Sequence, residues 1–278
     1  MNLTEQIISL ALFEDSGLGD ITSESILDSG HRGKGIMLAK ESFVLAGIEV
    51  AKKVFYSLDP GIECRSGFTD GDRISEGEIL FEARGRLIDL LKGERVALNF
   101  LQRLSGIATL TRTYVETLGS PPDNPGVRLV DTRKTTPGWR CLEKEAVRAG
   151  GGYNHRFSLF DGILIKDNHI AAAGSIEKAV RAVKSRTSHL MKIEVEVSSM
   201  DEVKEAVKSG ADVIMLDNMS PPDMEQAVEY IKGRAIVEAS GNVCLETLKR
   251  IASTGVDVIS CGSLTHQARS VDISMRIS

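Results

Sequence analysis

Short apolar runs alternate with helix-like stretches along the C-terminal half of the chain. Runs this short and rich in β-branched residues are typical of parallel strands covered by helices. The six runs are RLVDT (128–132), GILIK (162–166), KIEVEV (192–197), DVIML (212–216), AIVEAS (235–240) and DVISC (257–261). Repeated strand–helix units favour closure into a barrel, but an eight-unit barrel takes about 250 residues. Six strands therefore predict an incomplete α/β barrel, and a doubly wound sheet is disfavoured because no strand precedes a G-x-G-x-x-G turn.

The N-terminal half has a different pattern. Apolar runs cut by Gly, Asp and Ser at 33–47 and 62–86 predict strands joined by tight turns. Apolar spacing predicts a long helix over 88–117, and PPDNPG at 121–126 marks a break after it. Two further helices are expected, one capped by Thr4 and ending at the turn of Gly17 and Gly19, the other with the apolar face Ile48, Ala51, Val54 and Phe55.

Composition and charge exclude several classes of protein. The chain has 278 residues, 42% of them hydrophobic and 26% charged, which is the usage of an ordinary globular protein. The net charge of −5 argues against binding of nucleic acid, and no apolar stretch approaches the length of a membrane span. The start of the chain lacks the basic residues of a signal peptide. Four well-separated cysteines without zinc-site spacing indicate a reducing compartment, so we expect a cytoplasmic protein that binds no membrane.

Positive charge is concentrated in the middle of this acidic chain. Residues 84–169 contain 14 Lys and Arg against 9 Asp and Glu. Catalytic groups in α/β barrels gather at the C-terminal ends of the strands, and the first two predicted strands end close to five basic residues: Arg133, Lys134, His155, Arg156 and Lys166. Helix capping or solvation can explain a charged residue at any one strand end. Neither is a good explanation for charged residues or glycine at all six strand ends. Because guanidinium groups match carboxylate and phosphate, the cluster predicts a site for a small polyanion.

Acidic and glycine-rich strand ends predict a second kind of site. Glu196 and Asp217 end neighbouring strands and suit a Mg²⁺ ion or a pair of ribose hydroxyls. Ser240-Gly241-Asn242 and Gly262-Ser263 open the last two helices, where backbone N–H groups can hold a phosphate. A cationic pocket for an acid beside a phosphate and metal site indicates a transferase that acts on a phosphorylated sugar.

Several motifs carry a more specific resemblance over almost the whole chain. They are ALFEDSGLGDIT (11–22), ERVALNFLQRLSGIAT (94–109), DTRKTTPGWR (131–140), EKEAVRAGGGYNHR (143–156), ILIKDNH (163–169), IEVEV (193–197), IMLDNM (214–219), EASGNV (238–243) and LTHQARSVDIS (264–274). Together they resemble the quinolinate phosphoribosyltransferases, the carboxylating nicotinate-nucleotide pyrophosphorylases. Trp139, Asn242 and Gln267 depart from the pattern we expect for that family.

The resemblance implies a fold and an activity. The fold would be that of a type II phosphoribosyltransferase: an N-terminal α/β sandwich domain (1–108), completed by the tail 265–278, and an open α/β barrel (109–264). The reaction would convert quinolinate and phosphoribosyl pyrophosphate into nicotinate mononucleotide, CO₂ and pyrophosphate with Mg²⁺, in NAD synthesis. The enzyme would be a homodimer with shared active sites, and assembly into hexamers is left open.

The resemblance also implies roles for single residues. Arg95 would reach the neighbouring subunit's site. The quinolinate carboxylates would be bound by Arg95, Arg133, His155, Arg156 and Lys166. The phosphoribosyl pyrophosphate and its Mg²⁺ would be bound by Lys134, Glu196 and Asp217. Phosphate would be bound by Ser240, Gly241 and Gly262. Lys134, Lys166, Glu196 and Asp217 would be the catalytic residues. Two alternatives remain: a ModD-like paralogue with another acidic or aromatic substrate, and a non-catalytic anion-binding barrel protein.

Overall fold

The structure is a computed structural model that describes residues 2–28, 30–119 and 126–278. Contacts divide the chain into two compact units. The first unit comprises Met1–Arg112, Thr135–Gly151 and Leu264–Ser278, and the second comprises Thr113–Lys134 and Gly152–Ser263.

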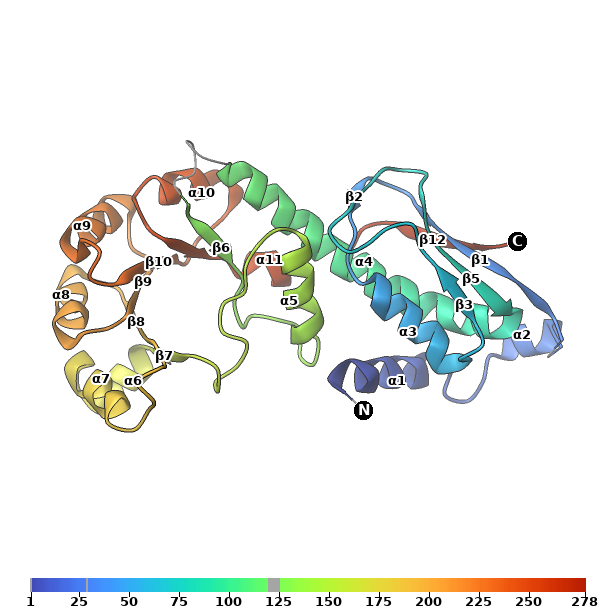
Figure 1. The fold of residues 1–278 in the computed structure, drawn as a ribbon, viewed down its shortest axis with the longest axis horizontal. Helices are drawn as coiled ribbons and strands as arrows, with labels where there is room; N and C mark the ends of the chain where they lie inside the picture. Colours follow the sequence, from blue (N-terminus) through green and yellow to red (C-terminus); the bar gives the residue numbers. More distant parts are fainter. Residues whose placement is uncertain (1, 29, 120–125) are drawn as a thin grey trace. The chain divides into compact units, whose positions relative to one another are not determined.

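A six-stranded parallel sheet forms the centre of the second unit (Figure 1). Its strand order is β6-β11-β10-β9-β8-β7, and every neighbouring pair is parallel. The strands are β6 (Arg128–Val130), β7 (Ile163–Ile165), β8 (Ile193–Val197), β9 (Val213–Asp217), β10 (Ile236–Ser240) and β11 (Val258–Ser260). Val195, Ile214 and Ala239 in the central strands have no more than a trace of exposed surface. Coverage of both faces explains why these runs are continuously apolar rather than alternating.

Helices connect the strands and lie along the outer side of the curved sheet (Figure 1). They are α6 (Asp167–Ala173), α7 (Ile176–Lys184), α8 (Met200–Ser209), α9 (Pro221–Ile231) and α10 (Leu245–Ala252); the short α11 (Ser263–His266) follows the last of these strands and belongs mostly to the first unit. Ser175, Ser199 and Ser220 cap α7, α8 and α9, because each side chain accepts a hydrogen bond from a backbone N–H of the first turn. Since β6 and β7 are the two edges of the described sheet, the prediction of an incomplete α/β barrel is confirmed.

An antiparallel sheet organises the first unit. Its order is β12-β1-β5-β3, formed by β1 (Arg32–Ala39), β3 (Glu63–Arg65), β5 (Ile79–Arg86) and β12 (Ile273–Ile277). The C-terminal β12 pairs with β1 over Gly35–Ala39, so the end of the chain completes a sheet built near its beginning. A separate pair joins β2 (Phe43–Val44) to β4 (Arg73–Ile74).

Five helices accompany this sheet. They are α1 (Leu3–Ser16), α2 (Ile21–Ile26), α3 (Ile48–Leu58), α4 (Leu87–Leu118) and α5 (Arg140–Ala149). The predictions for α3 and α4 are confirmed, but the predicted cap of α1 is wrong. Asn2, not Thr4, caps α1: its Oδ1 accepts from Glu5 N at 2.9 Å, and Glu5 Oε2 accepts from Asn2 N at 3.0 Å. This reciprocal pair satisfies two backbone donors at once, which a cap two residues later would leave open.

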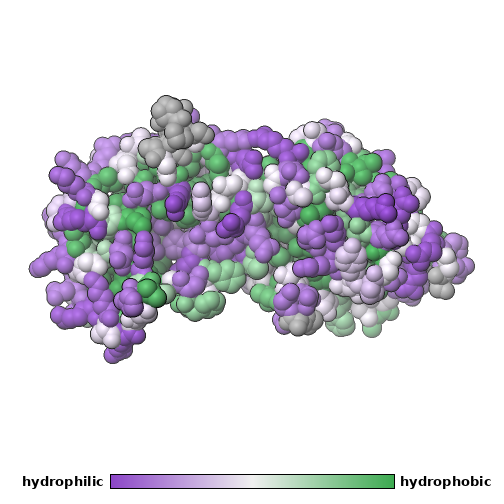
Figure 2. Space-filling view, viewed as in Figure 1, coloured by the Kyte–Doolittle hydropathy of each residue, from purple (hydrophilic) through white to green (hydrophobic). Residues whose placement is uncertain are grey.

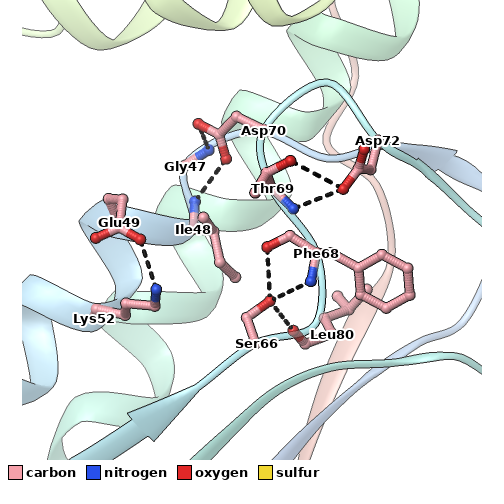
Figure 3. A network of polar contacts seen from close by, with 10 residues as sticks. All are labelled: Gly47, Ile48, Glu49, Lys52, Ser66, Phe68, Thr69, Asp70, Asp72 and Leu80. Atoms are coloured by element: carbon pink, nitrogen blue, oxygen red, sulfur yellow. Dashed lines mark hydrogen bonds and ion pairs between the residues drawn. The ribbon is translucent and has the colours of Figure 1, made fainter.

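Asp70 fixes the start of α3 from a loop far along the chain (Figure 3). Its two carboxylate oxygens accept hydrogen bonds from Gly47 N at 2.9 Å and Ile48 N at 3.1 Å. Gly47 has a φ of +95°, a conformation that glycine adopts without strain. A carboxylate at a helix N-terminus also interacts favourably with the helix dipole.

The boundaries of the two contact units differ from the domain boundaries expected from the sequence. The helix α4 runs across the division after Arg112, and the segment Thr135–Gly151 with α5 has its contacts in the first unit, although it lies within the range expected for the barrel. Arg112 illustrates this packing, because its guanidinium donates to the carbonyl groups of Ala149 and Gly150. Contacts of this kind involve residues distant in sequence, so apolar periodicity does not reveal them.

Polar residues dominate the molecular face in Figure 2, and hydrophobic residues form small patches between them. Among the described residues, no helix combines the length and the apolar character that crossing a membrane requires.

Candidate active site

A cavity of about 630 Å³ opens in the second unit at the C-terminal ends of the strands. This is a typical size for a small-molecule site. Nine of the eleven residues proposed from the sequence line it: Arg133, Lys134, His155, Arg156, Lys166, Glu196, Asp217, Ser240 and Gly241. The barrel thus brings together basic, acidic and glycine-rich strand ends that are separated by more than 100 residues.

Asp131 fastens the loop that carries the basic residues. This side chain is fully buried at the end of β6. Its carboxylate accepts hydrogen bonds from Asn154 Nδ2 at 2.7 Å and from His155 N at 2.9 Å. The backbone adds a parallel bridge between Val130 and Tyr153. The 153–156 loop is therefore tied to the first strand of the sheet, which explains why both segments supply cations to one cavity.

Arg156 and Arg133 form the most basic part of the cavity wall. Arg156 Nη1 donates to Gly162 O at 2.8 Å, which holds its guanidinium beside the start of β7. Burial, and next the positive charge of Arg133, lower the pKa of Arg156 from its usual value. The two guanidinium groups repel one another electrostatically. An anion bound between them would reduce this repulsion.

Lys166 and Glu196 form an ion pair across the ends of β7 and β8. Lys166 Nζ lies 2.5 Å from Glu196 Oε2, and both side chains are half-buried. The pair keeps the ammonium group at the cavity wall and links the ends of two neighbouring strands.

A buried cluster of His155, Glu194 and Glu238 lies beside the cavity. His155 Nδ1 accepts a hydrogen bond from the backbone N–H of Arg156 at 2.8 Å. Its Nε2 lies 3.2 Å from Glu194 Oε2 and 3.6 Å from Glu238 Oε1. The imidazole ring therefore lies between the loop backbone and two buried carboxyl groups.

Glu238 is the most strongly perturbed carboxyl group of the cluster. Burial, and next the nearby charge of Glu194, raise the pKa of Glu238 to about 7. A protonated Glu238 relieves the repulsion between the two buried carboxyl groups. The three side chains offer ligand atoms within 4.8 Å of one another. The raised pKa of Glu238 shows that this group retains its proton to a higher pH than an exposed carboxyl group does.

Glu196 and Asp217 are the better candidates for holding Mg²⁺. Both line the cavity from neighbouring strands, and both are half-buried. Asp217 Oδ2 accepts from Asn218 Nδ2 at 2.8 Å, so one oxygen of each carboxylate contacts a neighbouring side chain of the barrel. Carboxylate oxygens that line an open, polar cavity are the ligands that Mg²⁺ prefers.

Two proposed residues lie outside the cavity lining. Arg95 is exposed on α4, in the first unit. Gly262 is half-buried just after β11 and lies between Cys261 and Ser263, whose side chains are 2.9 Å apart. The lining also includes Leu164, Met215 and Ser260, which the sequence analysis missed. Leu164 and Met215 stand two residues before Lys166 and Asp217, so the two-residue period of a strand could have identified them.

The fold and the cavity define a class of protein: an open α/β barrel whose strand ends form a polar site for small anionic substrates. Two family models match the chain, namely the N-terminal domain of quinolinate phosphoribosyl transferase over residues 20–105 and its C-terminal domain over residues 107–276. The chain belongs to the quinolinate phosphoribosyltransferase family.

Similar proteins come from distant organisms. A probable carboxylating nicotinate-nucleotide pyrophosphorylase of Bacillus subtilis is 44% identical over 99% of this chain and 93% of its own length. The corresponding protein of Methanothermobacter thermautotrophicus is 43% identical, with 98% of each chain covered. Among solved structures, NadC from Streptococcus pyogenes is 45% identical, with a TM-score of 0.93 over 99% of this chain and 96% of the other. The similarity spans both units, which confirms the predicted family and fold.

Proposed function

We propose that this protein transfers the phosphoribosyl group of phosphoribosyl pyrophosphate to quinolinate and releases CO₂ and pyrophosphate, giving nicotinate mononucleotide for NAD synthesis. The observation that carries the proposal is the cavity itself. It combines two arginines for a dicarboxylate with two carboxylates and a glycine loop for a phosphorylated sugar. Membership of the family and relatives named for this activity support it.

Quinolinate binds at the basic side of the cavity. Its two adjacent carboxylates match the guanidinium groups of Arg133 and Arg156, and Lys166 supplies a third cation. The dianion places negative charge beside Arg156, whose pKa is lowered by burial and next by the positive charge of Arg133. His155 contacts the substrate from the same side of the cavity. Several oriented contacts fix the ring nitrogen for attack, which is the main contribution that positioning makes to such a reaction.

Phosphoribosyl pyrophosphate binds at the opposite side of the cavity. Ser240, Gly241 and Gly262 offer backbone N–H groups to its phosphate, and Lys134 contacts the pyrophosphate. Glu196 and Asp217 would hold Mg²⁺, directly or through water, and a bound ion would supply positive charge for the pyrophosphate leaving group. No covalent protein intermediate is needed, because the ring nitrogen of quinolinate is itself the nucleophile.

Decarboxylation follows from the new bond. When the ring nitrogen bonds to C1′ of the ribose, pyrophosphate leaves with the bonding electrons and the ring becomes a pyridinium cation. The carboxylate next to nitrogen then leaves as CO₂, and its electron pair stays on the adjacent ring carbon beside the positive nitrogen. That carbon takes a proton, which gives nicotinate mononucleotide. The cationic ring makes a separate decarboxylation cofactor unnecessary.

The shared dimeric site belongs to the same proposal. Arg95 is an exposed arginine of the first unit, and it does not line the cavity of its own chain. In a homodimer it extends into the partner's cavity and adds a cation for quinolinate. We also place the protein in the reducing cytoplasm, which suits its four free cysteines.

A direct assay tests the proposal. Purified protein should form nicotinate mononucleotide from quinolinate and phosphoribosyl pyrophosphate in the presence of Mg²⁺, and chelation with EDTA should abolish turnover. Nicotinic acid, which lacks the second carboxylate, serves as the matched control substrate. Product from nicotinic acid with none from quinolinate would contradict the assignment.

A further inference from the structure

The loops after β9 and β10 share an uncommon backbone conformation. The described residues contain three non-glycine positions with positive φ: Asn218 at +54°, Lys232 at +47° and Asn242 at +53°. Asparagine tolerates this region better than most residues, but it still adopts it rarely. Asn218 and Asn242 both line the cavity, so two of the three positions lie at one site.

The Asn218 side chain bridges two parts of this site. Its Nδ2 donates to Asp217 Oδ2 at 2.8 Å, and its Oδ1 accepts from Asn242 Nδ2 at 3.0 Å. The orientation of the amide is dictated by chemistry: an ionised carboxylate only accepts hydrogen bonds, so the NH₂ group must face Asp217. The oxygen then faces the loop after β10. Both polar ends of Asn218 are therefore occupied by the protein.

The backbone reinforces the same connection. Asn218 N donates to Ser240 O at 2.9 Å, and Ser240 is the residue in register with Asp217 on the neighbouring strand. Gly241 packs directly against the bridge, since a Cβ added there would lie 2.1 Å from Asn218 Oδ1. Gly241 has a φ of +88° as well. Only glycine fits at this position while Asn218 holds its place.

We propose that Asn218 is a positioning residue that fixes Asp217 relative to the loop Ser240–Asn242. The inference rests on the proposed function, in which Asp217 acts at the ribose and Mg²⁺ end of phosphoribosyl pyrophosphate and the loop binds its phosphate. Asn218 sets the spacing between these two groups, and Asn242 completes the bridge. The quinolinate side of the cavity has no part in the bridge, so its affinity is independent of Asn218.

Asn218→Gly isolates the side chain, because glycine keeps the positive φ without strain. We expect KM for phosphoribosyl pyrophosphate to rise on the order of 10-fold and kcat to fall, since a hydrogen bond to a charged group is lost. The Kd of quinolinate, measured by calorimetry, should stay within about twofold of the wild type. Lys232→Gly is the matched control: it removes a side chain at another positive-φ position, at the end of α9, and should leave the kinetics unchanged.

A double-mutant cycle tests the bridge itself. Asn242→Gly should have a smaller effect than Asn218→Gly, and the double variant should behave like Asn218→Gly alone, because Asn242 acts through Asn218. Additive effects, wild-type kinetics for Asn218→Gly, or an equal loss of affinity for both substrates would overturn the inference. Absence of turnover in the wild-type protein would instead contradict the proposed function, so the two failures are distinguishable.

Discussion

Replacing Glu238 with glutamine should change how stability depends on pH. The structure raises the pKa of this buried carboxyl group from 4.5 to about 7. The folded state therefore favours the protonated form more strongly than the unfolded chain does. The resulting stability is fully present below about pH 4.5 and is lost as the pH rises to about 7. A shift of this size corresponds to about 3 kcal/mol, at 1.36 kcal/mol for each pKa unit.

Glutamine mimics the protonated acid, because its amide donates a hydrogen bond and carries no charge. Relative to the wild type, the free energy of unfolding of Glu238→Gln should therefore increase by about 3 kcal/mol when the pH is raised from 4.5 to 7.5. Denaturant titrations at several pH values, without ligands, measure this difference. Glu225→Gln, at an exposed position of α9, controls for the change in net charge. If the free energies of unfolding of Glu238→Gln and the wild type differ by the same amount at both pH values, the raised pKa of Glu238 is contradicted.

Three further predictions concern other parts of the molecule. Arg95→Ala and Lys134→Ala subunits should each be nearly inactive alone, but mixing them should restore part of the activity, because a hybrid dimer contains one intact site. Verified heterodimers without activity would contradict the shared site. Gly106→Ala should destabilise the first unit by about 2 kcal/mol or more, because the new Cβ would lie 1.9 Å from Arg269 O and would displace the backbone of the C-terminal segment. Thermal unfolding measures this effect, and an unchanged melting temperature would count against this packing. Asp131→Ala should weaken quinolinate binding on the order of 10-fold in calorimetry, because the buried carboxylate ties the 153–156 loop to β6; an unchanged Kd would argue against this role.

Periodicity predicted most of the barrel because each strand is a continuous apolar run. The ends of β8, β9 and β10 lie within about one residue of the runs that the sequence marks. The same rule placed Glu196, Asp217 and Ser240 at one edge of the sheet, since parallel strands end on the same side. The cap of α1 was missed because Asn2 and Thr4 are both good capping residues, and only the reciprocal contact with Glu5 distinguishes them.

The cluster beside the cavity was beyond the reach of the sequence. Glu194 and Glu238 were visible as strand residues, but nothing in their spacing shows that both approach His155. The orientation of the His155 ring depends on a backbone N–H that the folded loop brings to Nδ1. The bridge through Asn218 likewise depends on positive φ angles in two separate loops. Residue types predicted the kind of chemistry, whereas these contacts required the tertiary structure.

The fate of the carboxylate next to the ring nitrogen tests the account most directly. Quinolinate labelled with ¹³C in that carboxylate is incubated with phosphoribosyl pyrophosphate, Mg²⁺ and the protein, and the products are followed by NMR. Labelled CO₂ and unlabelled nicotinate mononucleotide should form in equal amounts. Label retained in a nucleotide, or CO₂ released without nucleotide, would contradict it.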